Sequence, residues 1–259
     1  MSYVEDLFSL SGKTAVVIGG GGVLAGKMAE GLARAGANII ILDLNPENAT
    51  KKANELLKYG IKSSAIKIDA SRKEDLKTAA DQIVSQYGEV NIVINAPGIN
   101  SATPFFEIAE EEWQNIINVN LKSMVFSCQI FGELMIEAKK GGSIINISSA
   151  SSSVPLSKVF TYSISKAGVN NLTRFLSKEF SVHNIRVNAI APGFFPAEQN
   201  RKILTQERVD SIMNHTPMGR FGEPAELVGV TIWLASDKAS SFVTGAIVRV
   251  DGGFTAMTI

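Results

Sequence analysis

The feature that most constrains the fold of this chain is its regular alternation of short apolar runs with longer segments of helical spacing. The runs are apolar at consecutive positions rather than at every second one, which is typical of strands buried on both faces. A sheet built from such strands is parallel and is covered by helices on both sides. The apolar runs predict seven strands, at residues 14–18, 38–42, 64–68, 91–94, 143–147, 185–190 and 246–250.

The intervening segments predict the helices that connect these strands. Repeated strand–helix–strand units join parallel strands by right-handed crossovers, so we expect an α/β fold of the Rossmann type with a doubly wound, mainly parallel sheet. No linker-like stretch divides the 259 residues, and we expect a single domain over 1–259. Ligands of such folds bind beyond the carboxyl ends of the strands. The predicted helices lie at 23–35, 46–58, 72–87, 110–139, 162–182, 198–214 and 224–236.

Composition argues against several classes of protein. Lys and Arg number 25 and Asp and Glu number 25, so the chain has no net positive charge with which to bind nucleic acid. Its single cysteine, Cys128, excludes an internal disulfide and a cysteine-based zinc site, and we expect no metal. No apolar run approaches the roughly 20 residues that cross a bilayer, and the N-terminus lacks the apolar core of a signal peptide. We therefore expect a cytoplasmic protein with no nucleic-acid or membrane partner.

A glycine-rich turn follows the first predicted strand. Four consecutive glycines, from Gly19 to Gly22, lead directly into the next predicted helix. Glycines allow a phosphate to approach the backbone, and the start of a helix offers unpaired N–H groups with a partial positive charge. We predict a dinucleotide site here, and a flexible turn without a ligand is the alternative. The predicted cofactor contacts in this turn are Gly19, Gly22, Val23 and Leu24.

Asp43 ends the second predicted strand, and its position indicates which cofactor would bind. A carboxylate at this place accepts hydrogen bonds from both hydroxyls of an adenosine ribose and repels a 2′-phosphate. The glycine turn contains no Lys or Arg, and the apolar Leu44 follows the aspartate. These residues favour NAD over NADP. The alternative is an ordinary carboxylate that ends a strand before a turn.

Tyr162 and Lys166 stand four positions apart in a predicted helix, so their side chains share one face. A free tyrosine has a pKa of about 10 and is a poor base at neutral pH. A lysine cation about 4 Å away, at an effective dielectric constant of 20, supplies roughly the 4 kcal/mol needed to bring that pKa to about 7. Tyr162 would then exchange a proton with an alcohol while hydride passes to or from a nicotinamide. Ser149, after the fifth predicted strand, would hold the same oxygen by a hydrogen bond.

Together these residues resemble the short-chain dehydrogenase/reductase family, and the resemblance runs across nearly the whole chain. It implies that Ser149, Tyr162 and Lys166 are catalytic. It adds Asn120 as a fourth catalytic residue, which holds a water that relays protons from Lys166. The family is usually tetrameric, so a homotetramer or homodimer is implied. The further cofactor contacts that the resemblance implies are Asp69, Ala70, Asn95, Ala96, Tyr162, Lys166, Pro192 and Gly193.

Several positions depart from the family pattern. Ile18 stands where the family has threonine, and Val23 and Ala25 stand where it has glycines. Pro97 replaces the alanine of the family's Asn-Asn-Ala-Gly motif and, as a proline, lacks an N–H group. These changes bear on cofactor affinity and on the shape of the loop. A nucleotide-sensing protein without turnover is therefore an alternative, although the four catalytic positions are intact.

A narrower resemblance concerns the substrate. The GGGGVL turn, the LDLN segment and the APGFF…EQNR…HTPMGRFGEP tail are similar to D-mannonate oxidoreductases (fructuronate reductases) and gluconate 5-dehydrogenases. The resemblance implies a sugar acid such as D-mannonate or D-fructuronate, under a substrate lid at about 194–222. Alternatives are 5-ketogluconate, a polyol or a 3-ketoacyl substrate. A carboxylate needs a cation or backbone amides. The candidate cations are Lys158, Arg201, Lys202, His215 and Arg220, and the candidates for hydroxyl contacts are Asn100 and Gln199.

Overall fold

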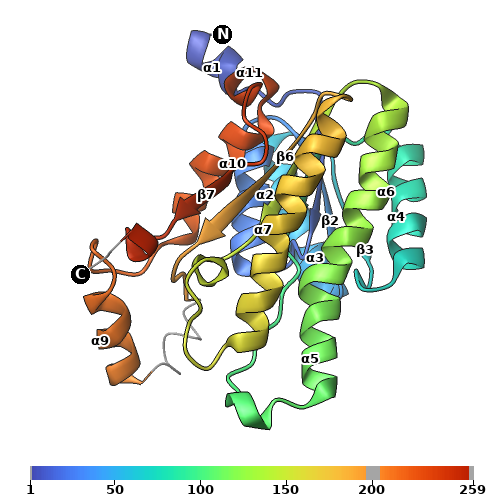
Figure 1. Cartoon of the computed structure of the whole chain (residues 1–259). Coiled ribbons are helices and arrows are strands. Elements are labelled where there is room, and N and C mark those ends of the chain that lie inside the picture. The colour runs from blue at the N-terminus through green and yellow to red at the C-terminus, as the bar shows by residue number, and fades with distance from the viewer. Residues whose placement is uncertain (1, 197–204, 257–259) are drawn as a thin grey trace.

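The strands form one parallel sheet, as the computed structural model shows for the residues it describes, 2–196 and 205–256. The strand order is β3-β2-β1-β4-β5-β6-β7, so the chain changes direction across the sheet between β1 and β4 (Figure 1). The predicted α/β doubly wound fold is confirmed. The strands are β1 (Thr14–Ile18), β2 (Asn38–Asp43), β3 (Ser63–Lys67), β4 (Ile92–Asn95), β5 (Gly142–Ile147), β6 (Ile185–Pro192) and β7 (Ile247–Val250).

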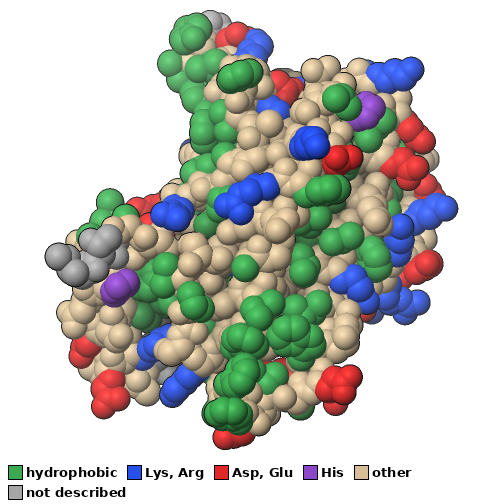
Figure 2. Space-filling model, in the orientation of Figure 1, with side chains coloured by type: hydrophobic (Ala, Val, Ile, Leu, Met, Phe, Trp, Pro, Cys, Tyr) green, Lys and Arg blue, Asp and Glu red, His purple; other side chains and the backbone are tan. Residues whose placement is uncertain are grey.

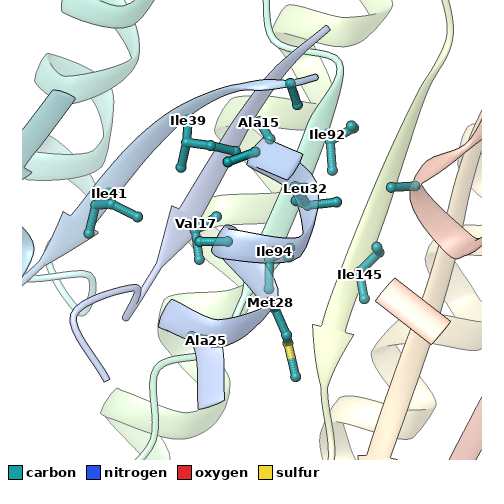
Figure 3. Packing of buried hydrophobic residues seen from close by; sticks show 14 of the residues in the cluster. Ala15, Val17, Ala25, Met28, Leu32, Ile39, Ile41, Ile92, Ile94 and Ile145 are labelled. Carbon is teal, nitrogen blue, oxygen red and sulfur yellow. The ribbon is translucent and has the colours of Figure 1, made fainter. Parts of the chain in front are cut away.

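Alternate residues of strands β1 to β6 belong to two different apolar cores. Ala15 and Val17 of β1 pack in one core with α2, α3 and α10, whereas Val16 and Ile18 pack in the other with α4 and α6. Figure 3 shows the first core, with side chains of α2 lying over those of the central strands. This arrangement explains why the inner strands are apolar at consecutive positions, because neither of their faces meets water.

The helices follow the predicted pattern, with differences at their ends. The part of the predicted helix 198–214 that precedes residue 205 lies outside the described residues. Two short helices were not predicted, and they contact each other near the N-terminus, where Lys238 Nζ lies 2.5 Å from Asp6 Oδ1. These two are α1 (Tyr3–Phe8) and α11 (Asp237–Ser240). The others are α2 (Val23–Arg34), α3 (Pro46–Leu56), α4 (Lys73–Tyr87), α5 (Glu110–Ile117), α6 (Ser123–Ala138), α7 (Phe160–Ser181), α9 (Gln206–Asn214) and α10 (Val228–Ala235).

The long helix predicted at 110–139 is interrupted. A π-helical turn, Asn118–Lys122, separates α5 from α6. A π-helical turn holds more residues than an α-helical turn and is found frequently at functional sites. The prediction of one continuous helix was therefore wrong in its middle, because apolar spacing does not reveal a local change of hydrogen-bond period.

Two further observations bear on the excluded classes. Within residues 2–196 and 205–256, no helix combines the length and apolar character needed to cross a bilayer. Over the same ranges, His, Cys, Asp and Glu side chains nowhere gather in a group of three that could hold a metal ion.

Candidate functional site

The best-defined cluster of polar side chains lies where β5 meets α7. Lys166 is only 3% exposed, and its Nζ donates a 2.9 Å hydrogen bond to the carbonyl oxygen of Ile147, the last residue of β5. The same Nζ lies 5.6 Å from the centre of the Tyr162 ring. Tyr162 and Lys166 thus share one face of α7, as their spacing predicts, and the end of the strand anchors the lysine.

Ser149 lies just beyond β5, with its hydroxyl in a defined hydrogen-bond arrangement. Ser149 Oγ accepts hydrogen bonds from the backbone N–H of Ser151 at 3.2 Å and from Ser151 Oγ at 3.1 Å. Because both of these contacts use Ser149 Oγ as an acceptor, its own hydrogen is available for donation. Ser149 is also near enough to Tyr162 to act on its phenol, since its hydroxyl works to lower the pKa of Tyr162.

The pKa of Tyr162 is shifted in the direction opposite to the one predicted from the sequence. Burial raises the pKa of Tyr162 above its ordinary value, and the hydrogen bond with Ser149 opposes this only in part. Burial also lowers the pKa of Lys166 to about 8. The predicted lowering of the Tyr162 pKa by Lys166 is therefore wrong for the protein without a cofactor. The physical reason is that removing the phenolate from water costs more than the hydrogen bond recovers.

Asn120 is fully buried in the π-helical turn, and its amide is bonded at both ends. Its Oδ1 accepts a 2.8 Å hydrogen bond from the backbone N–H of Ile99, and its Nδ2 donates to Ile99 O at 2.9 Å and to Ser165 Oγ at 3.0 Å. A Cβ placed on Gly98 would lie 3.5 Å from Lys166 Nζ and 3.7 Å from Asn120 Oδ1, so these groups converge. Asn120 thereby fixes the loop after β4 against α7. A water held here would use a remaining lone pair or the main chain.

The glycine turn is shaped for close contact. Gly19 has a φ of +75°, which L-residues with side chains rarely adopt, and a Cβ there would lie 2.9 Å from Ala96 O. Gly22 precedes α2 and gives it no side-chain cap. The first N–H groups of a helix have no partner within the helix. The first turn of α2, which begins at Val23 and Leu24, can therefore receive an anionic group at the end of β1.

Asp43 holds this turn as well as facing its predicted ligand site. Its Oδ2 accepts a 2.9 Å hydrogen bond from the N–H of Gly21, and its Oδ1 accepts one of 2.9 Å from the N–H of Asn45. Each carboxylate oxygen has a second lone pair free for a ribose hydroxyl. A Cβ on Gly21 would lie 2.9 Å from Asp43 Oδ2, so only glycine permits this approach. The sequence analysis did not single out Gly21, although the run of four glycines contained the signal.

The remaining predicted cofactor residues divide into two groups. The Asn95 side chain is fully buried and bonded to Asn146 Oδ1 at 2.8 Å and to Ser127, so it joins β4 to β5 and α6 and does not face a ligand. Asp69 Oδ1 accepts hydrogen bonds from the backbone and hydroxyl of Ser71 and is thereby fixed at the end of β3. The others lie at strand exits: Ala70 after β3, Ala96 after β4, and Pro192 and Gly193 at the end of β6.

A cavity of about 640 Å³ lies on the predicted substrate side. It is bounded by the segment 154–157, which follows Ser149, by α9, and by Phe194 and Phe254. Arg208 on α9 lines this cavity and donates a 2.9 Å hydrogen bond from Nη1 to Ser157 Oγ. Among the described carboxylates, none forms a salt bridge with Arg208. The sequence analysis did not identify Arg208, because nothing in its local sequence distinguishes it from a surface arginine.

The substrate residues proposed from the sequence have different surroundings. Arg220 is bound to Glu226 through two hydrogen bonds of 2.9 and 2.6 Å, so it serves a surface ion pair. In this structure the guanidinium of Arg220 is thus occupied by Glu226, and its predicted contact with a substrate carboxylate stays a prediction. His215 lines the cavity with its ring 4.7 Å from that of Phe254. Asn100 and Lys158 are exposed. Gln199, Arg201 and Lys202 lie outside the described residues.

Comparison with known proteins gives consistent results over almost the whole chain. A family model described as enoyl-(acyl carrier protein) reductase matches residues 22–255. The chain is 36% identical to a 5-keto-D-gluconate 5-reductase of Escherichia coli (strain K12), covering 96% of this chain and 98% of the relative.

Two solved structures are also similar to it. One is a gluconate 5-dehydrogenase from Burkholderia cenocepacia J2315 in complex with NADP and tartrate, with a TM-score of 0.94 and 32% identity over 99% of this chain and 100% of that one. The other, from Haemophilus influenza with bound NAD, is provisionally named a D-mannonate oxidoreductase; its TM-score is 0.93, with 36% identity over 98% of this chain and 99% of that one.

Proposed function

Because the chain belongs to the short-chain dehydrogenase/reductase family and is thus an oxidoreductase acting on CH–OH groups, we propose that it interconverts a secondary alcohol and a ketone of a sugar acid with NAD(H). The observation that carries this proposal is the cluster of Ser149, Tyr162 and Lys166 at the exit of β5. A hydroxyl donor, a phenol and a buried cation lie together there, and these groups can transfer a proton to or from an alcohol oxygen. D-Mannonate and D-fructuronate are the proposed substrate pair.

Each side chain of the cluster has a separate task in this proposal. Ser149 would donate its hydroxyl hydrogen to the substrate oxygen and fix that oxygen beside Tyr162. Tyr162 gives a proton to the oxygen in ketone reduction and takes it back in alcohol oxidation. Lys166, the buried cation beside the Tyr162 ring, would favour the phenolate, and the positive charge of a bound oxidised nicotinamide would add to this effect against that of burial. Asn120 keeps the loop after β4 against this cluster. When bound, the cofactor supplies or accepts the hydride.

The residues at the exits of β1 and β2 fit a dinucleotide, and Asp43 supports NAD over NADP. Its carboxylate keeps lone pairs for two ribose hydroxyls, and a 2′-phosphate would meet its negative charge. Leu44, the next residue, offers no positive charge to such a phosphate. Similar proteins have been solved with either cofactor, so the preference must be measured for this chain.

Arg208 is the proposed ligand of the substrate carboxylate. Its guanidinium presents five N–H donors, of which the contact to Ser157 uses one. Glu207 and Asp210 line the same cavity and suit the hydroxyls of a sugar chain as acceptors. The predicted contacts of Asn100, Lys158, Gln199 and Arg201 remain proposals for this side, as does a lid at about 194–222. A 5-keto acid such as 5-ketogluconate is the second candidate, favoured by the 36% identity to a 5-keto-D-gluconate 5-reductase.

Self-association and a cytoplasmic location complete the proposal. Phe105, Phe106, Phe160 and Ile164 are exposed near α5 and α7, and Figure 2 shows hydrophobic side chains gathered over the lower ends of these helices. Exposed apolar patches of this kind mark protein interfaces. A homotetramer or homodimer of this chain would cover them.

The test is oxidation of NADH followed by absorbance, with D-fructuronate, 5-ketogluconate and a neutral ketone as substrates and NADPH in parallel. Turnover of D-fructuronate with NADH and little with NADPH is expected. Turnover of 5-ketogluconate alone would replace the substrate and keep the reaction. Binding of NADH without turnover of any ketone, acidic or neutral, would contradict the catalytic assignment.

A further inference from the structure

Residues 147, 148 and 152, at and just beyond the end of β5, are each hydrogen-bonded to α7, and Asn170 bonds two of them. Ile147 O accepts from Lys166 Nζ, as described above. Ser148 Oγ donates a 2.6 Å hydrogen bond to Asn170 Oδ1. On the other side of Ser149, Asn170 Nδ2 donates a 2.8 Å hydrogen bond to Ser152 Oγ. Asn170 therefore holds the chain both before and after Ser149.

The hydrogen bonds of this arrangement run in one consistent direction. Ser152 Oγ accepts from Asn170 and donates its own hydrogen to the carbonyl oxygen of Ser149 at 2.6 Å. Ser148 is 2% exposed and Asn170 is 7% exposed, so water competes little for these groups. A buried amide with both ends bonded fixes its partners, because each broken contact would leave an unsatisfied polar group.

From this geometry we infer that Asn170 is a positioning residue, which sets the place of the Ser149 hydroxyl relative to Tyr162. Asn170 lies one helical turn after Lys166 and two turns after Tyr162 on α7. The helix that carries Tyr162 thus also carries the group that orients the Ser149 turn. The effect on catalysis rests on the proposed function. The clamp, by which we mean the hydrogen bonds of Asn170 to Ser148 and Ser152, does not depend on it.

Loss of Asn170 should lower the rate, because proton transfer depends on the exact position of the groups involved. A catalytic group displaced by about 1 Å lowers a rate by as much as 100-fold. Without Asn170, the turn keeps a longer contact of 3.3 Å between Ser148 Oγ and Lys166 O. The backbone bond from Ser148 N–H to Ile190 O also persists. The turn would therefore stay folded while the Ser149 side chain loses its fixed position.

The first test compares Asn170→Leu with Asn171→Leu, since Asn171 is the exposed neighbour on the same helix. We expect Asn170→Leu to lower kcat about 10-fold to 100-fold, with NADH affinity unchanged, and Asn171→Leu to leave both unchanged. Ser152→Ala removes the same link from the other end, and Ser153→Ala is its exposed control. If Asn170→Leu fails to fold, Ser152→Ala carries the test, and an unchanged kcat in it overturns the inference.

The deciding measurement is whether the effect depends on Ser149. In a Ser149→Ala background, Asn170→Leu should lower kcat no further, because the hydroxyl that it positions is gone. A loss of the same size in both backgrounds would mean a general structural role and would overturn the inference. If the wild type turns over no ketone, the proposed function fails instead.

A measurement that does not depend on enzyme activity tests the hydrogen bonds of Asn170 directly. Amide hydrogen exchange at 148–153 should rise in Asn170→Leu and stay unchanged in Asn171→Leu. Unchanged exchange at these residues in Asn170→Leu overturns the inference whether or not the wild type is active.

Discussion

The turn that carries Ser149 and the helix α9 lie at the same end of the sheet, but they are held in very different ways. The turn is bonded to α7 through residues 147, 148 and 152, and its contacts are largely buried. The α9 helix buries Ile212, and the side-chain hydrogen bond that it sends across the cavity is the one from Arg208 to Ser157. Its other side-chain bonds lie within or beside the helix, as from Gln206 to Asp210.

This difference suits two separate tasks, proton transfer at the turn and substrate recognition at the cavity. Proton transfer needs side chains held to within a fraction of an ångström, and a buried hydrogen-bond network provides that. Substrate recognition uses a cavity wall with few constraints, which can change its residues without disturbing the sheet. In the proposed function, the turn holds the residues that move the proton, and the cavity beside α9 would select the substrate.

Replacing Tyr162 with phenylalanine tests the tightly held side and should have the largest effect. The proton donor is lost while the ring still fills its place, so kcat should fall by about 100-fold to 10,000-fold. NADH affinity, measured by fluorescence titration, should stay near that of the wild type. Residual turnover within a few-fold of the wild type would show that the proton comes from elsewhere.

Lys166 provides a second test, through the dependence of stability on pH. Burial lowers its folded pKa to about 8 from 10.5, so between these two values the unfolded chain holds a proton that the folded chain has lost. Stability therefore rises with pH across this window, and full protonation below about pH 8 costs the fold about 3 kcal/mol at most.

Urea unfolding of wild type and Lys166→Met from pH 7 to 10 would measure this effect. The free energy of unfolding of the wild type should gain on that of the variant as pH rises, whereas the exposed control Lys178→Met should follow the wild type. Parallel curves for the wild type and Lys166→Met would mean that the lysine titrates normally.

The Asp43 turn extends the comparison to the cofactor, since it too is held by backbone hydrogen bonds. Asp43→Ala should weaken NADH binding about 10-fold to 100-fold, because charge-assisted hydrogen bonds of about 1.5–3 kcal/mol are lost. NADPH binding should weaken less or improve, since the negative charge is removed. Equal losses for both cofactors would assign Asp43 to the turn alone and contradict its role in the proposed preference for NAD.

Arg208→Leu tests the loosely held side and should have the smallest effect on catalysis. The KM for an acidic substrate should rise about 10-fold, from the loss of a charged hydrogen bond, while kcat changes little. The matched control is Arg34→Leu, at the C-terminal end of α2 and therefore at the opposite end of the sheet. An equal rise in KM for a neutral ketone would indicate a change in the shape of the cavity rather than loss of carboxylate binding.

The parts predicted well from the sequence are those in which many residues carry the same signal. The strands follow from runs such as Thr14–Ile18, whose bounds are confirmed. The shared face of Tyr162 and Lys166 follows from helical spacing and is seen in α7. Both rest on periodicity, which is a property of the local chain.

The parts that the sequence did not predict depend on single contacts between distant segments. Gly21 matters because it approaches Asp43, and the guanidinium of Arg220 is occupied because Glu226 binds it. The direction of the Tyr162 pKa depends on how deeply the ring is buried. Residue spacing and composition do not reveal these contacts or the burial of Tyr162, because each depends on how the whole chain packs.

The π-helical turn at Asn118–Lys122 has a consequence for how this protein tolerates insertions and deletions. Deleting one residue between α5 and α6 would let the segment close into a continuous α-helix. A π-helical turn absorbs one extra residue, so the faces of α5 and α6 would keep nearly the same orientation, while the widened turn that holds Asn120 against the Ile99 backbone would be lost. The catalytic loop is therefore sensitive to the number of residues in this helix as much as to their identity.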